Sequence, residues 1–419
     1  MTFAWRRAAA IAALAIVGWT SMTLAQAPDS AARRQQRSLD SLAAVVRALQ
    51  ARIDSLAGLR ARTGDTTIND ELAALRAAAA AAAGDPAATP APPPAPRSQN
   101  ALNPEMTVTG DVRAFAFDPG PQTNNVTLRH VEMGIQSALD PFSAAKVFVA
   151  FEDGEAHVEE AYAYYAGLPG HLRLDAGRFR QTFGELNRWH LHALNTDEYP
   201  LVIRRYAGDE GLAGTGVSLY WPLPFSGSAG TFELTVQATS GGNEVLFLES
   251  GRPAINAQLS GFWQLSRATF AQLSVSALRG SNPDTSLTTT AGALAARFSW
   301  RPPDRAMSRE FTIRGELWAL RRNLGLDGFT RTRLGGYADA SWRLSRRWVL
   351  GARADYVQSP DPGPFGHEWA VTPALTFWQS EFVYVRTLFE RAGTQAGPQS
   401  NRLGIQLVFA MGPHKHELF

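Results

Sequence analysis

The sequence predicts an all-β fold: a transmembrane antiparallel β-barrel of about 16 strands (16–18), preceded by an N-terminal coiled-coil helix. Three observations predict it. From Ala101 to Phe419 the chain divides into alternating stretches of roughly ten to fourteen residues. The connections between these stretches are alternately short and long. Tryptophans lie beside the short connections, as expected for side chains at a membrane–water interface.

The first residues predict a signal peptide at 1–27. A basic start, MTFAWRR, precedes the apolar run AAAIAALAIVGW, and Ala25 and Ala27 form an A-x-A pattern. The alternative is a transmembrane anchor, which the short apolar run disfavours. No later apolar run approaches the roughly 20 residues of a membrane helix. We therefore expect an exported protein.

Residues 31–83 predict a coiled-coil helix. Apolar residues recur three and four positions apart among polar neighbours, which is the a/d pattern of a coiled coil. They are Leu39, Leu42, Val46, Leu49, Ile53 and Leu56. The alternative is one amphipathic helix that packs on its own domain. Residues 84–100, GDPAATPAPPPAPRSQN, predict a Pro-rich linker, extended and semi-rigid.

Residues 101–419 predict the barrel. In FTIRGELWAL, Ile313 and Leu317 share one face, and Arg314 and Glu316 share the other. We expect sixteen strands, near 105–117, 125–138, 143–152, 156–166, 171–180, 212–221, 231–240, 253–264, 268–279, 288–300, 309–321, 332–344, 347–358, 367–378, 381–390 and 401–411.

The connections distinguish a membrane barrel from a soluble sandwich, whose strands would also alternate. After even-numbered strands they are short, as in ALDPF, LPG and LSRR; after odd-numbered strands they are longer, as in SGGNEVLFLESGR and SPDPGPFG. This is the layout of an outer-membrane barrel. The tryptophans beside short turns are Trp221, Trp263, Trp300, Trp342, Trp348 and Trp378. An even strand count places the N-terminal segment on the short-turn side, in the periplasm.

The composition excludes several classes of function. Without cysteine there is no disulfide scaffold, thiolate metal site or thiol nucleophile. A formal net charge of +2 gives no reason to expect nucleic acid as a partner. No nucleophile motif accompanies the histidines, so we expect neither an enzyme nor a cofactor. His414 and His416 in the tail could bind Zn²⁺ or could belong to a plug at the rim; we assign no metal ligand.

The longest connection, at about 181–211, is expected to fold into the lumen as a constriction loop, because long structureless loops are usually functional. Its charges could set selectivity, or they could pair with one another and hold the loop down. The expected constriction residues are Arg178, Arg180, Arg188, His190, His192, Arg204, Arg205 and Glu210. The expected lumen residues on the strands are Arg113, Arg314, Arg353, Asp355 and Arg386.

The segment GRFRQTFGELNRWHLHAL, followed by YPLVIRRYAGDEGLAGTGVSLYWPLP, resembles the outer-membrane porin superfamily. The similarity lies with uncharacterised bacterial members near the phosphate-selective porin O/P-like branch, and it covers about 101–419. The resemblance implies a trimeric barrel of 16–18 strands that passes solutes by diffusion. In this sequence the only lysine on an expected strand is Lys146, so strong phosphate selectivity is not expected.

Together these observations predict a porin for passive diffusion of small hydrophilic solutes or anions. Expected partners are the lipid bilayer, lipopolysaccharide and two further copies of the chain. One alternative is a non-conducting anchor, in which the barrel provides anchorage and the coiled coil an envelope interaction. A barrel enzyme is a third reading. An open lumen with a charged constriction favours the porin, and a lumen filled with packed side chains favours the anchor.

Overall fold

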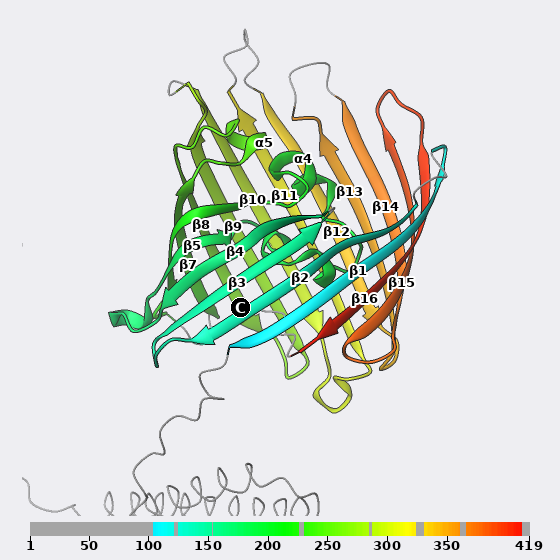
Figure 1. Ribbon diagram of the computed structural model, residues 1–419, viewed down its shortest axis with the longest axis horizontal. Coiled ribbons are helices and arrows are strands. Elements are labelled where there is room, and N and C mark those ends of the chain that lie inside the picture. Colours follow the sequence, from blue (N-terminus) through cyan, green and yellow to red (C-terminus); the bar gives the residue numbers. More distant parts are fainter. Residues whose placement is uncertain are drawn as a thin grey trace, which may run out of the picture. The chain divides into compact units, whose positions relative to one another are not determined.

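A computed structural model describes residues 104–120, 125–152, 154–225, 230–284, 287–323, 331–360 and 366–412 of the chain (Figure 1). The predicted signal peptide at 1–27, coiled coil at 31–83 and Pro-rich linker at 84–100 lie outside these residues. The tail with His414 and His416 also lies outside them.

Sixteen antiparallel strands form one closed barrel, which confirms the predicted antiparallel barrel and its strand number. The strands are β1 (Glu105–Asp118), β2 (Val126–Ala138), β3 (Ser143–Glu152), β4 (Glu155–Tyr165), β5 (Arg173–Arg180), β6 (Ala213–Pro222), β7 (Thr231–Ser240), β8 (Pro253–Gln264), β9 (Thr269–Ser281), β10 (Thr288–Trp300), β11 (Glu310–Arg322), β12 (Thr332–Arg343), β13 (Trp348–Gln358), β14 (His367–Trp378), β15 (Val383–Thr394) and β16 (Ser400–Met411).

Each strand pairs with its neighbours in sequence, and β1 pairs with β16 to close the wall (Figure 1). Closure satisfies the backbone groups that a sheet edge would expose, as a membrane-spanning sheet requires. Two β-bulges interrupt the ladders between the described strands. Arg129 has no partner where β1 pairs with β2, and Glu159 has none where β3 pairs with β4. A bulge changes the direction of a side chain relative to the regular alternation.

The two faces of the wall differ in polarity. On β11, Leu317 is 66% exposed on the outer face, whereas its neighbour Glu316 is 1% exposed on the inner face. On β13, Leu350 is exposed and Arg353 is buried inside. The five predicted lumen residues all have inward side chains that are largely buried. The outer face therefore suits lipid, and the inner face is polar and charged.

Short helices occur in the connections, where the sequence predicted none. They are the 3₁₀ turns η1 (Pro169–His171), η2 (Leu186–Arg188), η3 (Leu191–Ala193) and η4 (Pro303–Arg305), and the α-helices α4 (Leu201–Ala207) and α5 (Glu244–Phe247). Among the residues that the structure describes, no helix has the length and apolarity needed to cross a bilayer. The helices are too short to leave a periodic pattern in the sequence.

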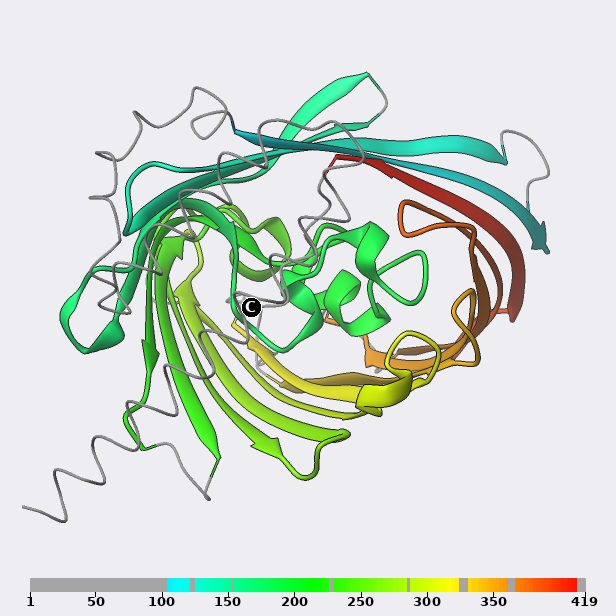
Figure 2. The ribbon, with the colours of Figure 1, turned by 90° about the horizontal axis from the view of Figure 1, so that it is seen from below.

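Residues 181–212, called the inward segment from here on, include α4 and lie inside the ring of strands (Figure 2). Their apolar side chains form a buried cluster with inward residues of the wall. Phe183 packs edge-on against Trp318 of β11, with ring centroids 4.6 Å apart. Leu194, Tyr199, Val202 and other members of the cluster are almost inaccessible. The barrel thus encloses a hydrophobic core of its own.

Replacing Leu317 by Arg tests the orientation of the wall. Leu317 lies near the middle of β11 and faces outward. We expect the variant to lose about 2–4 kcal/mol of stability in lipid vesicles, because a charge is moved into hydrocarbon. Denaturant titration of the vesicle-inserted protein measures this loss, with Leu317→Ile as the control. A variant as stable as the wild type would contradict the assigned outer face.

Candidate functional site

The inward segment begins and ends at one point of the wall. The pairing of β5 with β6 stops at Arg180 and Ala213, and the Gln181 N–H then donates to the Leu212 carbonyl at 2.9 Å. Asn187 joins these two ends. Its side-chain amide N–H groups donate to the Gln181 and Leu212 carbonyls, each at 2.8 Å, and its amide oxygen accepts from the Leu212 N–H. The 32-residue excursion (181 to 212) is therefore closed at its base like an Ω-loop.

The first part of the segment is bound by polar side chains of β7, β8, β9 and β11. Glu316 of β11 is the central acceptor. One of its carboxylate oxygens accepts from the N–H groups of Glu185 and Leu186, each at 2.9 Å. The same carboxylate accepts from the Tyr337 hydroxyl and the Trp318 indole, each at 2.6 Å. Four donors on one buried carboxylate fix this turn against the wall.

Gly184 makes this contact possible. Its φ of +65° is in the left-handed region, and a Cβ atom there would lie 2.0 Å from the Glu316 carboxylate. Its N–H donates to the Ser276 hydroxyl, and its carbonyl accepts from the Gln258 amide at 2.7 Å. Neighbouring Thr182 is held similarly, by Gln237 and Asn256. A residue with a side chain would not fit.

The second part of the segment is bound by arginines of β13, β15 and β16. Arg386 donates to the carbonyls of Leu194 and Thr196 at 2.7 and 2.9 Å. Arg353 donates to the Glu198 carbonyl at 2.6 Å and pairs with Asp355. The predicted lumen arginines on these strands thus contact peptide groups of the inward segment.

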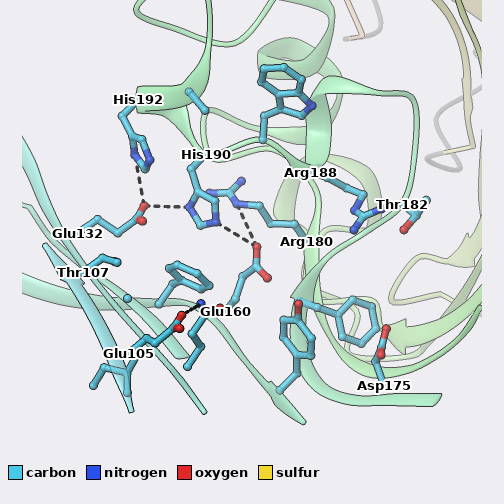
Figure 3. A pocket seen from close by; sticks show the side chains of 18 of the residues that line it. Glu105, Thr107, Glu132, Glu160, Asp175, Arg180, Thr182, Arg188, His190 and His192 are labelled. Atoms are coloured by element: carbon cyan, nitrogen blue, oxygen red, sulfur yellow. Dashed lines mark hydrogen bonds and ion pairs between the residues drawn. The ribbon is translucent and has the colours of Figure 1, made fainter. Parts of the chain in front are cut away.

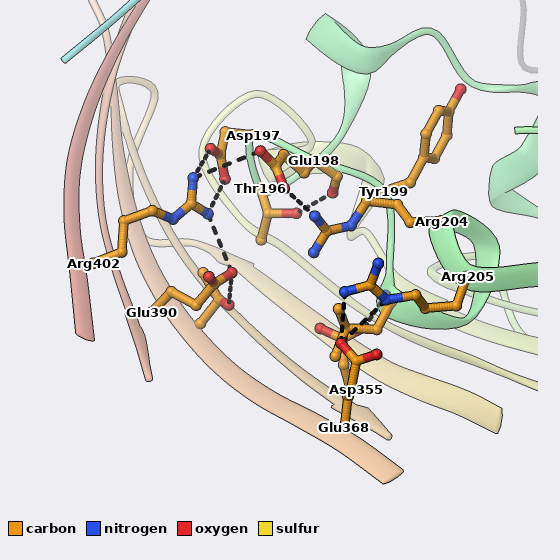
Figure 4. A network of polar contacts seen from close by, with 12 residues as sticks. Thr196, Asp197, Glu198, Tyr199, Arg204, Arg205, Asp355, Glu368, Glu390 and Arg402 are labelled. Carbon is orange, nitrogen blue, oxygen red and sulfur yellow. Dashed lines mark hydrogen bonds and ion pairs between the residues drawn. The ribbon is translucent and has the colours of Figure 1, made fainter. Parts of the chain in front are cut away.

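A network of ion pairs lies beside these contacts (Figure 4). Arg402 of β16 contacts both carboxylate oxygens of Asp197, at 2.7 and 3.2 Å, and also Glu390. Burial alone would raise the pKa of Asp197, but the Arg402 charge and hydrogen bonds outweigh burial and lower that pKa. Within the segment, Arg204 pairs with Glu198 at 2.5 Å. The charges hold the segment in place.

A third cluster surrounds His190, where the segment meets β2 and β4 (Figure 3). The His190 Nδ1 atom lies 2.9 Å from carboxylate oxygens of both Glu132 and Glu159, and Nε2 lies 3.3 Å from Glu160. The β4 bulge explains why the adjacent residues Glu159 and Glu160 both reach this point. Burial opposes the charged form of His190, but Glu132 and the other carboxylates raise its pKa well above the ordinary value.

Three of the cavities bounded by the described residues adjoin the inward segment. The first, of about 410 Å³, is lined by Arg113, Arg402, Glu198 and Glu390, among others. The second, of about 350 Å³, is bounded by residues of β5 to β10 and by the segment. Its charged lining residues are Arg173, Arg188, Arg297, Asp175, Glu185 and Glu233. The third, of about 90 Å³, lies beside His190 (Figure 3). Each cavity has both acidic and basic walls.

The eight predicted constriction residues do not form one group. His190 and His192 lie near the Glu132 carboxylate, and Arg180 donates to the neighbouring Glu159. Arg188 is exposed and lines the second cavity. Arg204 and Arg205 belong to the ion pairs with Glu198 and Glu368.

In the contacts of the remaining two predicted residues, the acceptor is a backbone carbonyl. Arg178 donates to the Val158 carbonyl away from the clusters, and the Glu210 carbonyl, not its carboxylate, accepts from Arg180. Sequence reasoning missed the anchoring roles of Asn187, Glu316 and Arg402.

Replacing Glu316 by Ala is expected to loosen the segment. The change leaves four buried donors without their acceptor, at a cost of about 3 kcal/mol or more. Hydrogen exchange at the amides of Glu185 and Leu186 should accelerate accordingly. Glu310→Ala, on the same strand at a rim ion pair with Arg343, is the control. Unchanged protection at both amides would contradict the anchoring role.

The Asp197–Arg402 pair is expected to make stability depend on pH. Because the pKa of Asp197 is lowered by folding, its stabilisation is fully present above the ordinary value of about 3.9 and is lost as the pH falls through the folded-state value. The difference in unfolding free energy between the wild type and Asp197→Asn should therefore shrink between about pH 5 and pH 2. A difference that stays constant over this range would argue against the pair.

No family model matches the chain. One curated relative, an uncharacterized protein of Aquifex aeolicus (strain VF5), is 33% identical over 126 residues, which are 30% of this chain. The match spans only 26%, about a quarter, of that relative's length.

Solved outer-membrane proteins share the architecture. Pseudomonas putida OprB covers 75% of this chain and 95% of its own, with 9% identity and a TM-score of 0.52. Salmonella typhi OmpF, solved as a complex with daunomycin, covers 74% and 99%, with 8% identity and a TM-score of 0.52. The trimer form of Vibrio cholerae OmpT covers 74% and 99%, with 10% identity and a TM-score of 0.50. At these identities the likeness shows the fold, that of an outer-membrane porin-type barrel.

Proposed function

We propose that this chain is an outer-membrane porin that lets small hydrophilic solutes or anions diffuse passively, with the inward segment as its constriction. The observation that carries the proposal is the closed barrel, apolar outside and charged inside, with cavities of about 350 and 410 Å³ against the segment. A wide polar lumen narrowed by a folded-in loop selects solutes by size and by the charges at the narrowest point.

The cavity walls favour weak ion selectivity. The second cavity has three arginines against three acids, and the first has two against two. Most of these charges are already paired, so they present little net field to a passing ion. This balance supports small polar or zwitterionic solutes over a strongly phosphate-selective pathway, in line with the single strand lysine.

The location and assembly are part of the same proposal. The barrel would lie in the outer membrane among lipids and lipopolysaccharide, with the short connections and the N-terminal coiled coil in the periplasm. The proposed assembly is a homotrimer, which the trimer form of OmpT supports by analogy of fold. The proposal involves no enzyme activity.

A second candidate is the non-conducting anchor, and one observation favours it. The inward segment packs Phe183, Tyr199, Val202 and Tyr206 against apolar side chains of the wall, so part of the lumen is filled by a dry core. Such a core excludes water and ions from the space that it occupies. The two candidates differ in whether a continuous path remains around this core.

Single-channel recording in a planar bilayer distinguishes the two candidates. The porin predicts conductance that appears in steps grouped by three, as expected for a trimer. The purified protein must first be shown to be folded, for example by its β-sheet circular dichroism. Silence from folded protein would refute the porin and support the anchor.

Reversing the charge of Arg188 tests the pathway itself. This exposed side chain lines the second cavity. In a KCl gradient, Arg188→Glu should shift the reversal potential toward cation preference, because it turns the local balance acidic. Arg305→Glu, on the exposed turn η4, is the matched control and should leave the potential unchanged. Equal potentials for Arg188→Glu and the wild type would place the pathway elsewhere.

A further inference from the structure

Imidazoles and carboxylates converge where the inward segment meets β2. His130 and Glu132 are two residues apart on β2, and both side chains are buried inside the barrel. His192, from the turn η3 of the segment, points toward Glu132 (Figure 3). One potential ligand atom from each of the three residues lies within 4.8 Å of the other two. The wall and the segment thus share one cluster.

A second, independent observation points to a ligand at this cluster. His130 is only 3% exposed, and within the described part of the chain its Nε2 atom is buried without a hydrogen-bond partner. An unsatisfied buried polar atom is costly, and native structures usually explain one by a bound water or ion. The ring of His130 lies beside that of His192, with centroids 6.3 Å apart.

We propose that His130, Glu132 and His192 bind one divalent transition-metal ion of the Zn²⁺ class. Two neutral imidazoles and one carboxylate are a common ligand set for Zn²⁺ and similar ions, whereas Ca²⁺ and Mg²⁺ prefer oxygen ligands alone. The third cavity, of about 90 Å³, is lined by Glu132 and His192 and has room for a water molecule as a further ligand.

The surrounding charges favour this set over its neighbour. Glu132, Glu159 and His190 also lie close enough to share an ion, but Glu159 is bound by Arg180 at 2.8 Å. The His190 Nδ1 atom lies 2.9 Å from a Glu132 carboxylate oxygen. His190 would orient this carboxylate without binding the ion itself.

Arg129 precedes His130 on β2, and its positive charge would repel a metal ion bound there. Its guanidinium donates to the Asp197 carbonyl and lies 3.9 Å from the Asp111 carboxylate. These contacts direct the Arg129 charge toward acceptors of its own. They reduce its repulsion of an ion held by His130 and Glu132.

The ion would cross-link the wall to the inward segment, because two ligands come from β2 and one from η3. Binding to the folded state alone would stabilise the docked position of the segment. This role does not depend on passive diffusion: it applies equally to an open porin and to a closed anchor.

Titration of the full-length, chelator-stripped protein with ZnCl₂ in detergent tests the proposal. Isothermal calorimetry should detect one equivalent, and His130→Gln and His192→Gln should each weaken binding by about tenfold or more. Zn²⁺ should raise the unfolding temperature of the wild type and have little effect on either variant. The unfolding curve without metal shows that each variant is folded.

Two controls separate this cluster from other histidines. His157→Gln changes an exposed imidazole of β4 and should bind like the wild type. The double variant His414→Ala/His416→Ala removes the tail imidazoles, and it should still bind one equivalent of Zn²⁺. The proposal is overturned if the wild type binds no Zn²⁺, if both cluster variants bind normally, or if only the tail variant loses binding.

Discussion

Irregular backbone inside a barrel must have its peptide groups satisfied, and most of this structure follows from that constraint. The inward segment has too little helix to satisfy its own N–H and C=O groups. The wall therefore supplies donors and acceptors: Glu316 for N–H groups on one side, and Arg353 and Arg386 for carbonyls on the other. Side chains that would line a plain pore are used here to bind a loop.

The same constraint explains the mixture of charges in the lumen. A buried carboxylate or guanidinium is costly unless it is paired and hydrogen-bonded. Arg402 meets this requirement with Asp197 and Glu390, and Arg314 meets it with Asp339. Because most of these described charges have a partner, the inner face is polar without a strong net field. Exposed groups such as Arg188 are left to act on solutes.

The strands could be predicted from sequence because their signal is local. Alternation with a period of two identifies a strand from its own residues, and only the end of β15 differs by as much as four residues, since it continues to Thr394 instead of 390. The helix α4 was missed because seven residues carry too little periodicity, and its first N–H is held by Asp355, 154 positions away.

The contacts of the site could not be predicted for a similar reason. The segment was expected to fold inward, but its partners depend on strand tilt and register, which one sequence does not reveal. His130 was not a candidate because it looks like any inward residue until His192, 62 positions later, lies beside it. Glu159 reaches the cluster because of the bulge in β4, and no Gly or Pro in the sequence predicts that bulge.

The position of the anchors has a consequence for the order of assembly. The segment follows β5, yet its anchors lie on strands as late as β16. Contacts so distant in sequence form slowly, since the intervening chain must be ordered first. The apolar side chains of the segment therefore stay without their partners until the later strands are in place. During biogenesis the segment is the part of the barrel that most needs protection from aggregation.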